Sequence, residues 1–367
     1  MVSSLRIAFF GSSLVSTYWN GAATYYRGMI RALAARGHRV TFYEPDALDR
    51  QSHRDMQDPE WARVVVYPAR QVSQVLRALD SARDADIIVK ASGVGVHDGL
   101  LESAALALRR PGSLVIFWDV DAPATLERVA RDASDVFGKL AREYDFILTY
   151  GGGQRVIDGY RALGATRCIP IYNALDPTTH HPVEPQARFA GLLGFLGNRL
   201  PDREARVREF LFGSARQLPE STFLLGGSGW DAGAGAPPNV KLLGHVGSCD
   251  HNAFNVTPHG VLNINRDSMA RTGFSPPTRV FEAAGAGACL LTDAWEGLEQ
   301  FLEPDREVLS ARNADELVEH LYRLTAKTAR LIGHAARQRV LAEHTYEHRA
   351  RQFEAVIDGA VCAGVAA

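Results

Sequence analysis

The chain has 367 residues, of which 46% are hydrophobic and 22% are charged, with a formal net charge of -2. This length exceeds one ordinary hydrophobic core and suits two α/β domains. The near-neutral charge supplies no basic field, so we expect no nucleic-acid partner. Cys168, Cys249, Cys289 and Cys362 are scattered without a CxxC pair. We therefore expect a reducing compartment, with neither a disulfide framework nor a zinc knuckle.

The N-terminal segment MVSSLRIAFFGSSLVS could be a signal peptide or a first β-strand. Its apolar run is short, Arg6 is the only early charge, and a Gly-Ser turn followed by a helical pattern ends it. A first strand is therefore favoured. Elsewhere no stretch approaches the roughly 20 apolar residues that span a bilayer. We expect a cytoplasmic protein without a transmembrane segment; a homodimer is compatible with the sequence.

Apolar runs alternate with helical patterns through the first half of the chain, which predicts a parallel sheet covered on both faces. Strands are predicted at residues 5–11, 39–45, 85–92, 113–121, 145–153 and 168–173, and helices at 20–38, 99–112 and 122–144.

Residues 173–189 contain three prolines and no periodicity, which indicates an interdomain linker. A second alternating series follows, and residues 313–361 are predicted to be helical throughout. Strands are predicted at residues 190–199, 221–229, 240–246, 260–266 and 288–294, and helices at 203–219 and from Arg279 onward. We expect two doubly wound, Rossmann-like α/β domains that face each other across a cleft, residues 1–185 and 186–340.

Ligands of open parallel sheets bind beyond the carboxyl ends of the strands, so the residues there carry the functional information. The turn after the first strand lacks the GxGxxG spacing of a dinucleotide site, and an ordinary turn is the alternative at Gly11. Three glycines also end the segment 145–153, where close approach of a substrate or of the other domain and a flexible turn are equally compatible. The acceptor-side candidates are Ser12, Trp19, Asn20, Gly151 and Gly152.

Two carboxylates lie at the end of the strand at 113–121, in the segment WDVDAP. Asp119 and Asp121 are two residues apart and point to the same side of a strand, so one could be a base and the other could orient it. Alternatively, Asp121 caps the helix that begins at Ala122. His97 is a second catalytic candidate, with a surface loop as its alternative.

The strand ends of the second half carry arginines and glycines that could form an anion site, because a helix N-terminus and free backbone amides both favour negative charge. The candidates are Asn198, Arg199, Arg203, Gly227, His245, Val246, Arg266, Ser268, Ser275 and Arg279.

Glu282 lies on a helix whose neighbouring residues are apolar or small, and a carboxylate in such a place normally has a partner. Ribose hydroxyls are one suitable partner; a salt bridge to Arg279 and a solvent-facing position are the alternatives. No metal-ligand spacing is visible. The pair His180–His181 is expected to be a loop without a nearby partner, so we expect no metal site.

Two such domains with GFSPPTRVFEAAGAGACLLTD near the end of the second resemble GT-B-fold glycosyltransferases. The closer resemblance is to the CgeB-like (spore-maturation-type) group, through six motifs: FWDVDAPATL, TYGGG, CIPIYNALDP, FLGNRLPDREARV, LLGGSGW and RVFEAAGAGACLLTD. It implies a transferase of the hexosyltransferase kind (EC 2.4) that uses a nucleotide-sugar donor, UDP- or another NDP-sugar, with no other cofactor and no metal. It also implies a terminal helix, residues 341–367, that crosses back to the first domain.

The resemblance further implies roles for single residues in the second domain. Glu282 would bind the ribose hydroxyls, Arg199 or Arg203 the diphosphate, and the segment at His245 and Val246 the nucleobase. Phe274 stands where related retaining enzymes often have an acidic residue near the donor sugar.

Three functions are therefore compared. The leading one is a metal-independent glycosyltransferase acting on an acceptor hydroxyl or similar nucleophile. A nucleotide-sugar 2-epimerase would use the same pair of domains. A non-catalytic nucleotide- or carbohydrate-binding protein is the third, against which the density of charged strand-end residues argues. The missing GxGxxG and acidic partner disfavour an NAD-dependent oxidoreductase.

Overall fold

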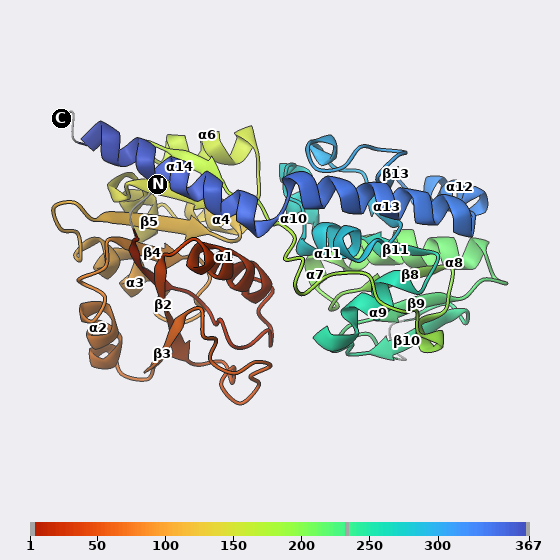
Figure 1. Ribbon diagram of the computed structural model, residues 1–367, viewed down its shortest axis with the longest axis horizontal. Coiled ribbons are helices and arrows are strands. Elements are labelled where there is room, and N and C mark those ends of the chain that lie inside the picture. Colours follow the sequence, from red (N-terminus) through yellow and green to blue (C-terminus); the bar gives the residue numbers. More distant parts are fainter. Residues whose placement is uncertain (1–3, 232–234, 365–367) are drawn as a thin grey trace. The chain divides into compact units, whose positions relative to one another are not determined.

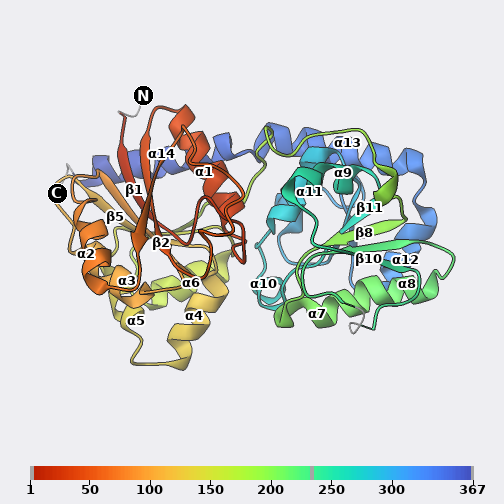
Figure 2. The same cartoon turned by 90° about the horizontal axis from the view of Figure 1, so that it is seen from below.

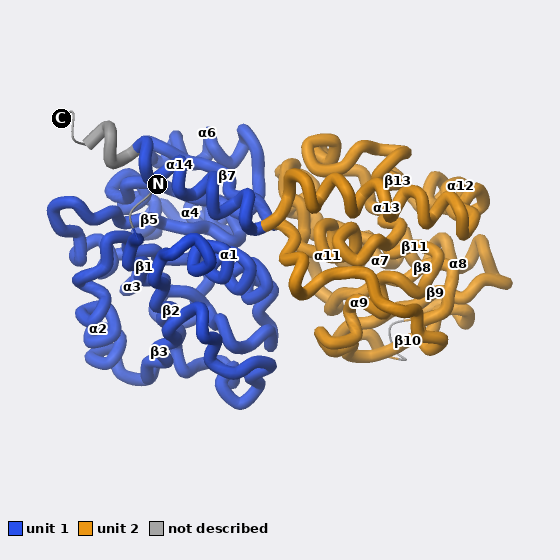
Figure 3. Tube along the Cα trace, viewed as in Figure 1, with its two compact units in different colours: residues 1–173, 346–367 blue, residues 174–345 orange. Residues whose placement is uncertain are grey.

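The structure, a computed structural model, describes residues 4–231 and 235–364, and it divides into two compact units (Figure 3). Unit 1 comprises residues 1–173 and 346–367, and unit 2 comprises residues 174–345. Each unit is a parallel sheet covered by helices on both faces (Figures 1 and 2), which confirms the predicted α/β class. In the described residues no helix is long and apolar enough to cross a membrane.

Unit 1 has a seven-stranded parallel sheet in the order β3-β2-β1-β4-β5-β6-β7. Its strands are β1 (Arg6–Phe10), β2 (Arg39–Asp46), β3 (Arg63–Pro68), β4 (Ile87–Ala91), β5 (Leu114–Asp119), β6 (Phe146–Thr149) and β7 (Cys168–Pro170). Its helices are α1 (Ala23–Ala35), α2 (Val72–Asp80), α3 (Asp98–Leu106), α4 (Ala122–Arg131), α5 (Val136–Leu140), the 3-10 turn Ala141–Glu143, α6 (Gln154–Ala162) and α14 (Tyr346–Gly364).

Helices cover both faces of the sheet in unit 1. Helices α1 and α14 cover one face of the sheet, and α3, α4, α5 and α6 lie on the other (Figure 2). Gly28 lets α1 pack closely against α14, because a Cβ at this position would lie 2.1 Å from the ring of Tyr346. The order of the strands reverses between β1 and β4, which defines the switch point where α/β sheets bind ligands.

Unit 2 has a six-stranded parallel sheet in the order β10-β9-β8-β11-β12-β13, with its own switch point between β8 and β11. Its strands are β8 (Leu193–Leu196), β9 (Phe223–Gly226), β10 (Val240–Gly244), β11 (Gly260–Asn263), β12 (Leu290–Asp293) and β13 (Leu309–Ala311). Its helices are α7 (Pro201–Val207), the π-turn Arg208–Phe212, α8 (Gly213–Gln217), α9 (His251–Val256), α10 (Asp267–Thr272), α11 (Thr278–Ala286), α12 (Ala314–Arg323) and α13 (Ala326–Glu343); short 3-10 turns occupy Ala187–Phe189, Ser248–Asp250 and Leu298–Gln300.

Helices α9, α11 and α13 lie on one face of the unit 2 sheet, and α7 and α8 lie on the other (Figure 2). The division between the units falls at 173/174 and 345/346, not at the expected 185/186 and 340/341. The reason is that the proline-rich segment packs on unit 2. The Leu175 N–H donates to the His344 carbonyl at 2.8 Å, and the side chain of Leu175 lies where a Cβ on Gly285 would be, at 2.2 Å.

Two predicted long helices are interrupted. The helix expected over 122–144 ends at Arg131, because Asp132 bonds the backbone and hydroxyl of Ser134, and Asp135 then caps α5. The helix expected over 313–361 is three helices. Thr325 begins the second with a capping box, and the break before α14 falls at Thr345.

Candidate functional site in unit 2

Two half-buried arginines lie near the carboxyl end of β8. Arg203, on α7, donates from Nη2 to the Asn198 carbonyl at 2.7 Å. Arg279, in the first turn of α11, donates from Nη2 to the Leu196 carbonyl and from Nη1 to Asn255 Oδ1, both at 3.3 Å. Among the described residues, the Nε of neither arginine has a hydrogen-bond partner. Both guanidinium groups are thus held by neutral acceptors beside the switch point.

The charge of this arginine pair is poorly compensated. Burial, followed by the neighbouring Arg279 and Arg266, lowers the pKa of Arg203 from its ordinary 12.5 to about 10. No carboxylate of the described residues lies within ion-pair distance of Arg203. Within the part of the chain that the structure describes, the one carboxylate at ion-pair distance from Arg279 is that of Glu282, whose Oε2 lies 3.7 Å from Nη1. Buried cations without close anions are costly, so the pair is suited to an anionic ligand such as a phosphate.

The other arginines at this edge differ because each is neutralised. Arg199 pairs bidentately with Glu204, at 2.7 and 2.9 Å. Arg206 pairs with Asp293 at 2.5 Å, and Arg266 with Asp202 at 3.1 Å. Of the two arginines that the sequence offered for a diphosphate, the structure therefore leaves the charge of Arg203, not of Arg199, available.

Glu282 is 6% exposed on α11, one turn after Arg279. Burial alone would raise its pKa, but His180, Arg279 and His251 outweigh this and leave the pKa below its ordinary value. The carboxylate is therefore ionised at neutral pH. Burial, then Arg279, lowers the pKa of His251 to about 4, so this imidazole is neutral.

The expectation that His180 has no nearby partner is wrong. One ligand atom from each of His180, His251 and Glu282 can be chosen so that all three lie within 4.8 Å of one another. The two histidines are 71 positions apart in the sequence and come from the segment before β8 and from the start of α9. Their proximity is a product of the fold.

The loops after β8 and β9 are joined closely. Asn198 Oδ1 accepts from the Ser228 N–H at 2.9 Å, and the Gly227 N–H donates to the Gly244 carbonyl at 2.7 Å. Gly227 has φ +124°, and a Cβ there would lie 2.2 Å from the Gly197 carbonyl oxygen, so only glycine fits.

The remaining predicted donor residues are spread along the same edge. His245 is exposed, whereas Val246 is buried against Leu196 and Phe254. The Ser268 hydroxyl donates to Asp202 at 2.7 Å, and the buried Ser275 hydroxyl donates to the Gly273 carbonyl at 2.9 Å.

In unit 1, Asp119 is completely buried at the end of β5. Its carboxylate accepts from the hydroxyls of Ser92, Thr125 and Tyr160 and from the Asp121 N–H. Burial raises the pKa of Asp119, an effect that these donors oppose. The residue ties the ends of β4, α4 and α6 together.

Asp121 and His97 occupy the starts of two helices. Asp121 is the N-cap residue of α4, where its carbonyl accepts from the Thr125 N–H at 3.0 Å, although its side chain makes no capping bond within the described chain. His97 precedes α3 in a left-handed conformation, and its Nε2 lies 2.6 Å from the Ala69 carbonyl oxygen.

The acceptor-side candidates lie in the turns after β1 and β6. Ser12 is buried and donates to Asn20 Oδ1 at 2.8 Å, while Trp19 is 61% exposed. Gly151 and Gly152 are buried, and the φ of +88° at Gly152 requires glycine. The sequence did not single out Arg50, which is buried at the β1–β4 switch point and donates to the carbonyls of Ser12 and Val94 at 3.2 and 3.0 Å.

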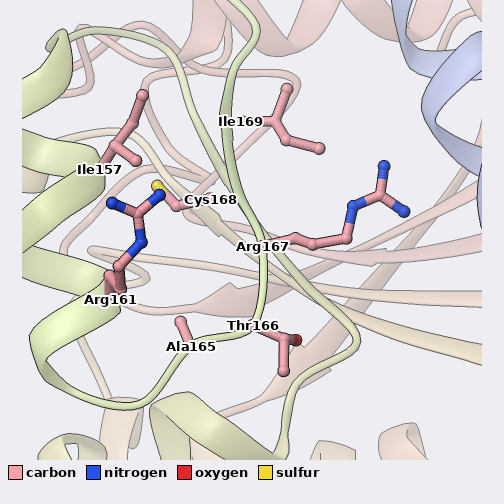
Figure 4. A pocket seen from close by; sticks show the side chains of 7 residues that line it. All are labelled: Ile157, Arg161, Ala165, Thr166, Arg167, Cys168 and Ile169. Atoms are coloured by element: carbon pink, nitrogen blue, oxygen red, sulfur yellow. The ribbon is translucent and has the colours of Figure 1, made fainter.

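A cavity of about 260 Å³ lies between α6 and β7 (Figure 4). It is lined by Ile157, Arg161, Ala165, Thr166, Arg167, Cys168 and Ile169. Because Thr166 and Arg167 precede β7, the cavity lies at the amino end of that strand. It is therefore separate from the strand-end residues described above.

Comparison with known proteins agrees with this architecture. Residues 203–355 match the family model described as glycosyl transferase-like. A sucrose-phosphate synthase from Thermosynechococcus elongatus aligns with a TM-score of 0.69 at 15% identity, covering 98% of this chain and 100% of that one. Anabaena HepE, in complex with UDP and glucose, aligns with a TM-score of 0.69 at 13% identity, covering 97% and 100%. A search of curated proteins found no match.

The chain has the GT-B fold. T4 phage BGT, in complex with its UDP-glucose substrate, shares the fold at a TM-score of 0.60 and 12% identity, over 96% of this chain and 100% of that one. In the GT-B chain described here, the matched family segment contains Arg203, His251, Arg279 and Glu282, whereas His180 precedes it.

Proposed function

We propose that the protein is a glycosyltransferase that moves a hexosyl group from a nucleoside-diphosphate sugar to an acceptor hydroxyl, without a bound metal. Unit 2 holds the donor and unit 1 supplies the acceptor chemistry. We further propose that the enzyme belongs to the CgeB-like group, which the six motifs named above support, and that it acts in the cytoplasm, which the scattered cysteines without a CxxC pair support.

The observation that carries the proposal is the pair Arg203 and Arg279. Two guanidinium groups beside one strand end, one without a carboxylate and one with a partner at 3.7 Å, favour a ligand with more than one negative charge. A diphosphate meets that requirement, and its departure as a leaving group needs stabilisation of developing charge, which preorganised arginines supply. This role does not require a metal ion.

Glu282 supports a nucleoside rather than an inorganic anion. Its ionised carboxylate can accept from both hydroxyls of a ribose, and it lies on the same helix as Arg279, one turn further on. Exposed His245 and the loop after β10 would then contact the base. The complexes of HepE with UDP and glucose and of T4 phage BGT with UDP-glucose favour a uridine donor.

For the acceptor side we propose Asp121 as the base and Asp119 as the residue that orients it. The carboxylate of Asp119 already accepts from four donors, one of them the Asp121 N–H. In the transfer step the acceptor oxygen bonds to the anomeric carbon of the sugar, and the bond from that carbon to the β-phosphate oxygen breaks. The acceptor proton passes to Asp121, and the nucleoside diphosphate leaves.

A product screen tests the proposal. The full chain is incubated with UDP-, GDP-, ADP- and dTDP-sugars, with and without a panel of acceptors, and free nucleotide and sugar products are identified by mass spectrometry and NMR. We expect at least one donor to release nucleoside diphosphate and to transfer its sugar. Release of a 2-epimerised free sugar would make the protein an epimerase, and tight binding without turnover would make it a binding protein; either result rejects the proposal.

A further inference from the structure

His180, His251 and Glu282 form a three-residue cluster in unit 2, and the proposed function uses only Glu282 of the three. Their candidate ligand atoms all lie within 4.8 Å of one another. The ring centroids of the two histidines are 6.3 Å apart, with an interplanar angle of 31°. Two imidazoles and one carboxylate form a donor set that suits zinc and neighbouring transition metals, whereas magnesium prefers oxygen ligands alone.

The fold holds the segment of His180 against helix α11. Gly285, one turn after Glu282, has no side chain there, and a Cβ would lie 3.1 Å from the His180 carbonyl oxygen. The Asn252 side chain donates to the Thr179 carbonyl at 2.9 Å, which joins the same segment to α9 beside His251. The segment is thus fastened to both helices that carry the other two cluster residues.

Both imidazoles have a hydrogen-bonding neighbour. His180 Nδ1 lies 3.0 Å from the Thr179 hydroxyl, which leaves Nε2 of that ring for a ligand, and the backbone of Val246 bonds the ring of His251. In metal sites the second ring nitrogen is usually held in this way, because the outer bond fixes the orientation of the ring.

We propose that His180, His251 and Glu282 bind a transition-metal ion of the Zn²⁺ type, and that this ion competes with the donor nucleotide for Glu282. Three protein ligands leave a fourth coordination position open to water. A bound ion would draw the three ligand atoms to roughly 2.0–2.2 Å from itself and so cover the carboxylate that the ribose needs. The competition rests on the proposed function, whereas the metal site does not. The ion would inhibit the enzyme rather than assist it.

Arg279 sets the strength of the site. Its guanidinium lies 3.7 Å from the carboxylate of Glu282 and opposes a second cation. It is, however, directed to the Leu196 carbonyl and Asn255 by its other bonds. We therefore expect affinity weaker than that of a closed four-ligand structural site, and release of the ion by a chelator.

The test is titration of the full chain, without a polyhistidine tag, with Zn²⁺ by calorimetry and with Co²⁺ by visible absorption. The variants are His180→Ala, His251→Ala and, as the matched control, His181→Ala, which alters the exposed neighbour of His180. We expect one ion per chain, affinity lowered at least about tenfold in His180→Ala and His251→Ala, and no change in His181→Ala. Circular dichroism checks the fold of each variant.

Absence of Zn²⁺ binding, equal affinity in His180→Ala and the parent, or an equal loss in His181→Ala would overturn the metal site. For the competition, UDP is titrated at increasing Zn²⁺ concentration, and its apparent Kd should rise in the parent but not in His180→Ala. A Zn²⁺-independent Kd would overturn the competition. If no nucleoside diphosphate binds at all, the proposed function fails, and the metal titrations alone decide the site.

Discussion

Replacement of Arg203 by Gln should affect the free protein and its nucleotide complex in opposite directions. The pKa of Arg203 falls from 12.5 to about 10 in the folded chain. A pKa shift of one unit corresponds to about 1.36 kcal/mol, so keeping this guanidinium charged at pH 7 costs ~3 kcal/mol of folding stability. The lowered pKa belongs to a base, so this cost is complete below pH 10 and disappears as pH rises from 10 to 12.5.

Glutamine removes that cost and loses the bond to the Asn198 carbonyl, worth about 1 kcal/mol. The free variant should therefore be as stable as the parent or more stable by about 1–2 kcal/mol. Nucleoside diphosphate binding should weaken by roughly 1.5–3 kcal/mol, because a charge-assisted bond to phosphate is lost. Urea unfolding gives the first quantity, and calorimetric titration with UDP and GDP gives the second.

Arg208→Gln is the matched control. Arg208 lies five residues further along, pairs with Glu204 at 2.8 Å and is 37% exposed, so its loss should change neither stability nor binding by more than about 0.5–1 kcal/mol. The reasoning would be refuted if Arg203→Gln destabilised the free protein by about 2 kcal/mol or more and left the nucleotide affinity unchanged. Arg203 would then be a structural residue.

Three further predictions concern the same sites. Glu282→Ala should raise the apparent donor constant, because donor binding weakens by roughly 1.5–3 kcal/mol, and the circular dichroism spectrum should stay normal. Unchanged nucleotide affinity in calorimetry would show that Glu282 does not bind the ribose. EDTA should leave transfer intact, or raise it where trace Zn²⁺ is present; complete loss that Mg²⁺ or Mn²⁺ restores would reject metal independence. Asp119→Asn should lower the free energy of unfolding by about 1–3 kcal/mol, because its amide faces several donors, whereas Asp121→Asn should keep stability and nucleotide binding but lose transfer at saturating substrates. Near-normal turnover in Asp121→Asn would leave His97 as the base to test.

The alternation of apolar runs and helical patterns predicted most of both parallel sheets. Fully buried strands such as β8 and β9 form continuous segments without charged residues, which is typical of parallel sheets. Strand β3 and the three-residue β13 were missed. The residues of β3, RVVVYP, include a β-branched apolar run that also indicates a strand, whereas the three residues of β13 are too few for a periodic pattern.

Two features of the site depend on how side chains pair in the folded chain, which residue type and spacing alone do not predict. The sequence does not distinguish Arg199 from Arg203 as a phosphate ligand. In the structure Arg199 pairs bidentately with Glu204, which neutralises its charge, whereas the charge of Arg203 remains available. His180 and His251 meet because Gly285 lets the proline-rich segment lie on α11. Glu282, by contrast, was visible from the sequence, since a lone carboxylate on an otherwise apolar helix requires a partner.

The most direct test of the central claim, that unit 2 binds a nucleoside diphosphate through Arg203, compares UDP, UMP and uridine by calorimetric titration in the parent and in Arg203→Gln. If the arginine pair holds the diphosphate, UDP should bind more tightly than UMP, and UMP more tightly than uridine. The difference between UDP and UMP should shrink by roughly tenfold or more in Arg203→Gln. If uracil is not the base that the protein binds, the same comparison is made with GDP and GMP and with ADP and AMP. Equal affinity for the nucleoside diphosphate and monophosphate in the parent, or an undiminished difference in the variant, would contradict the assignment.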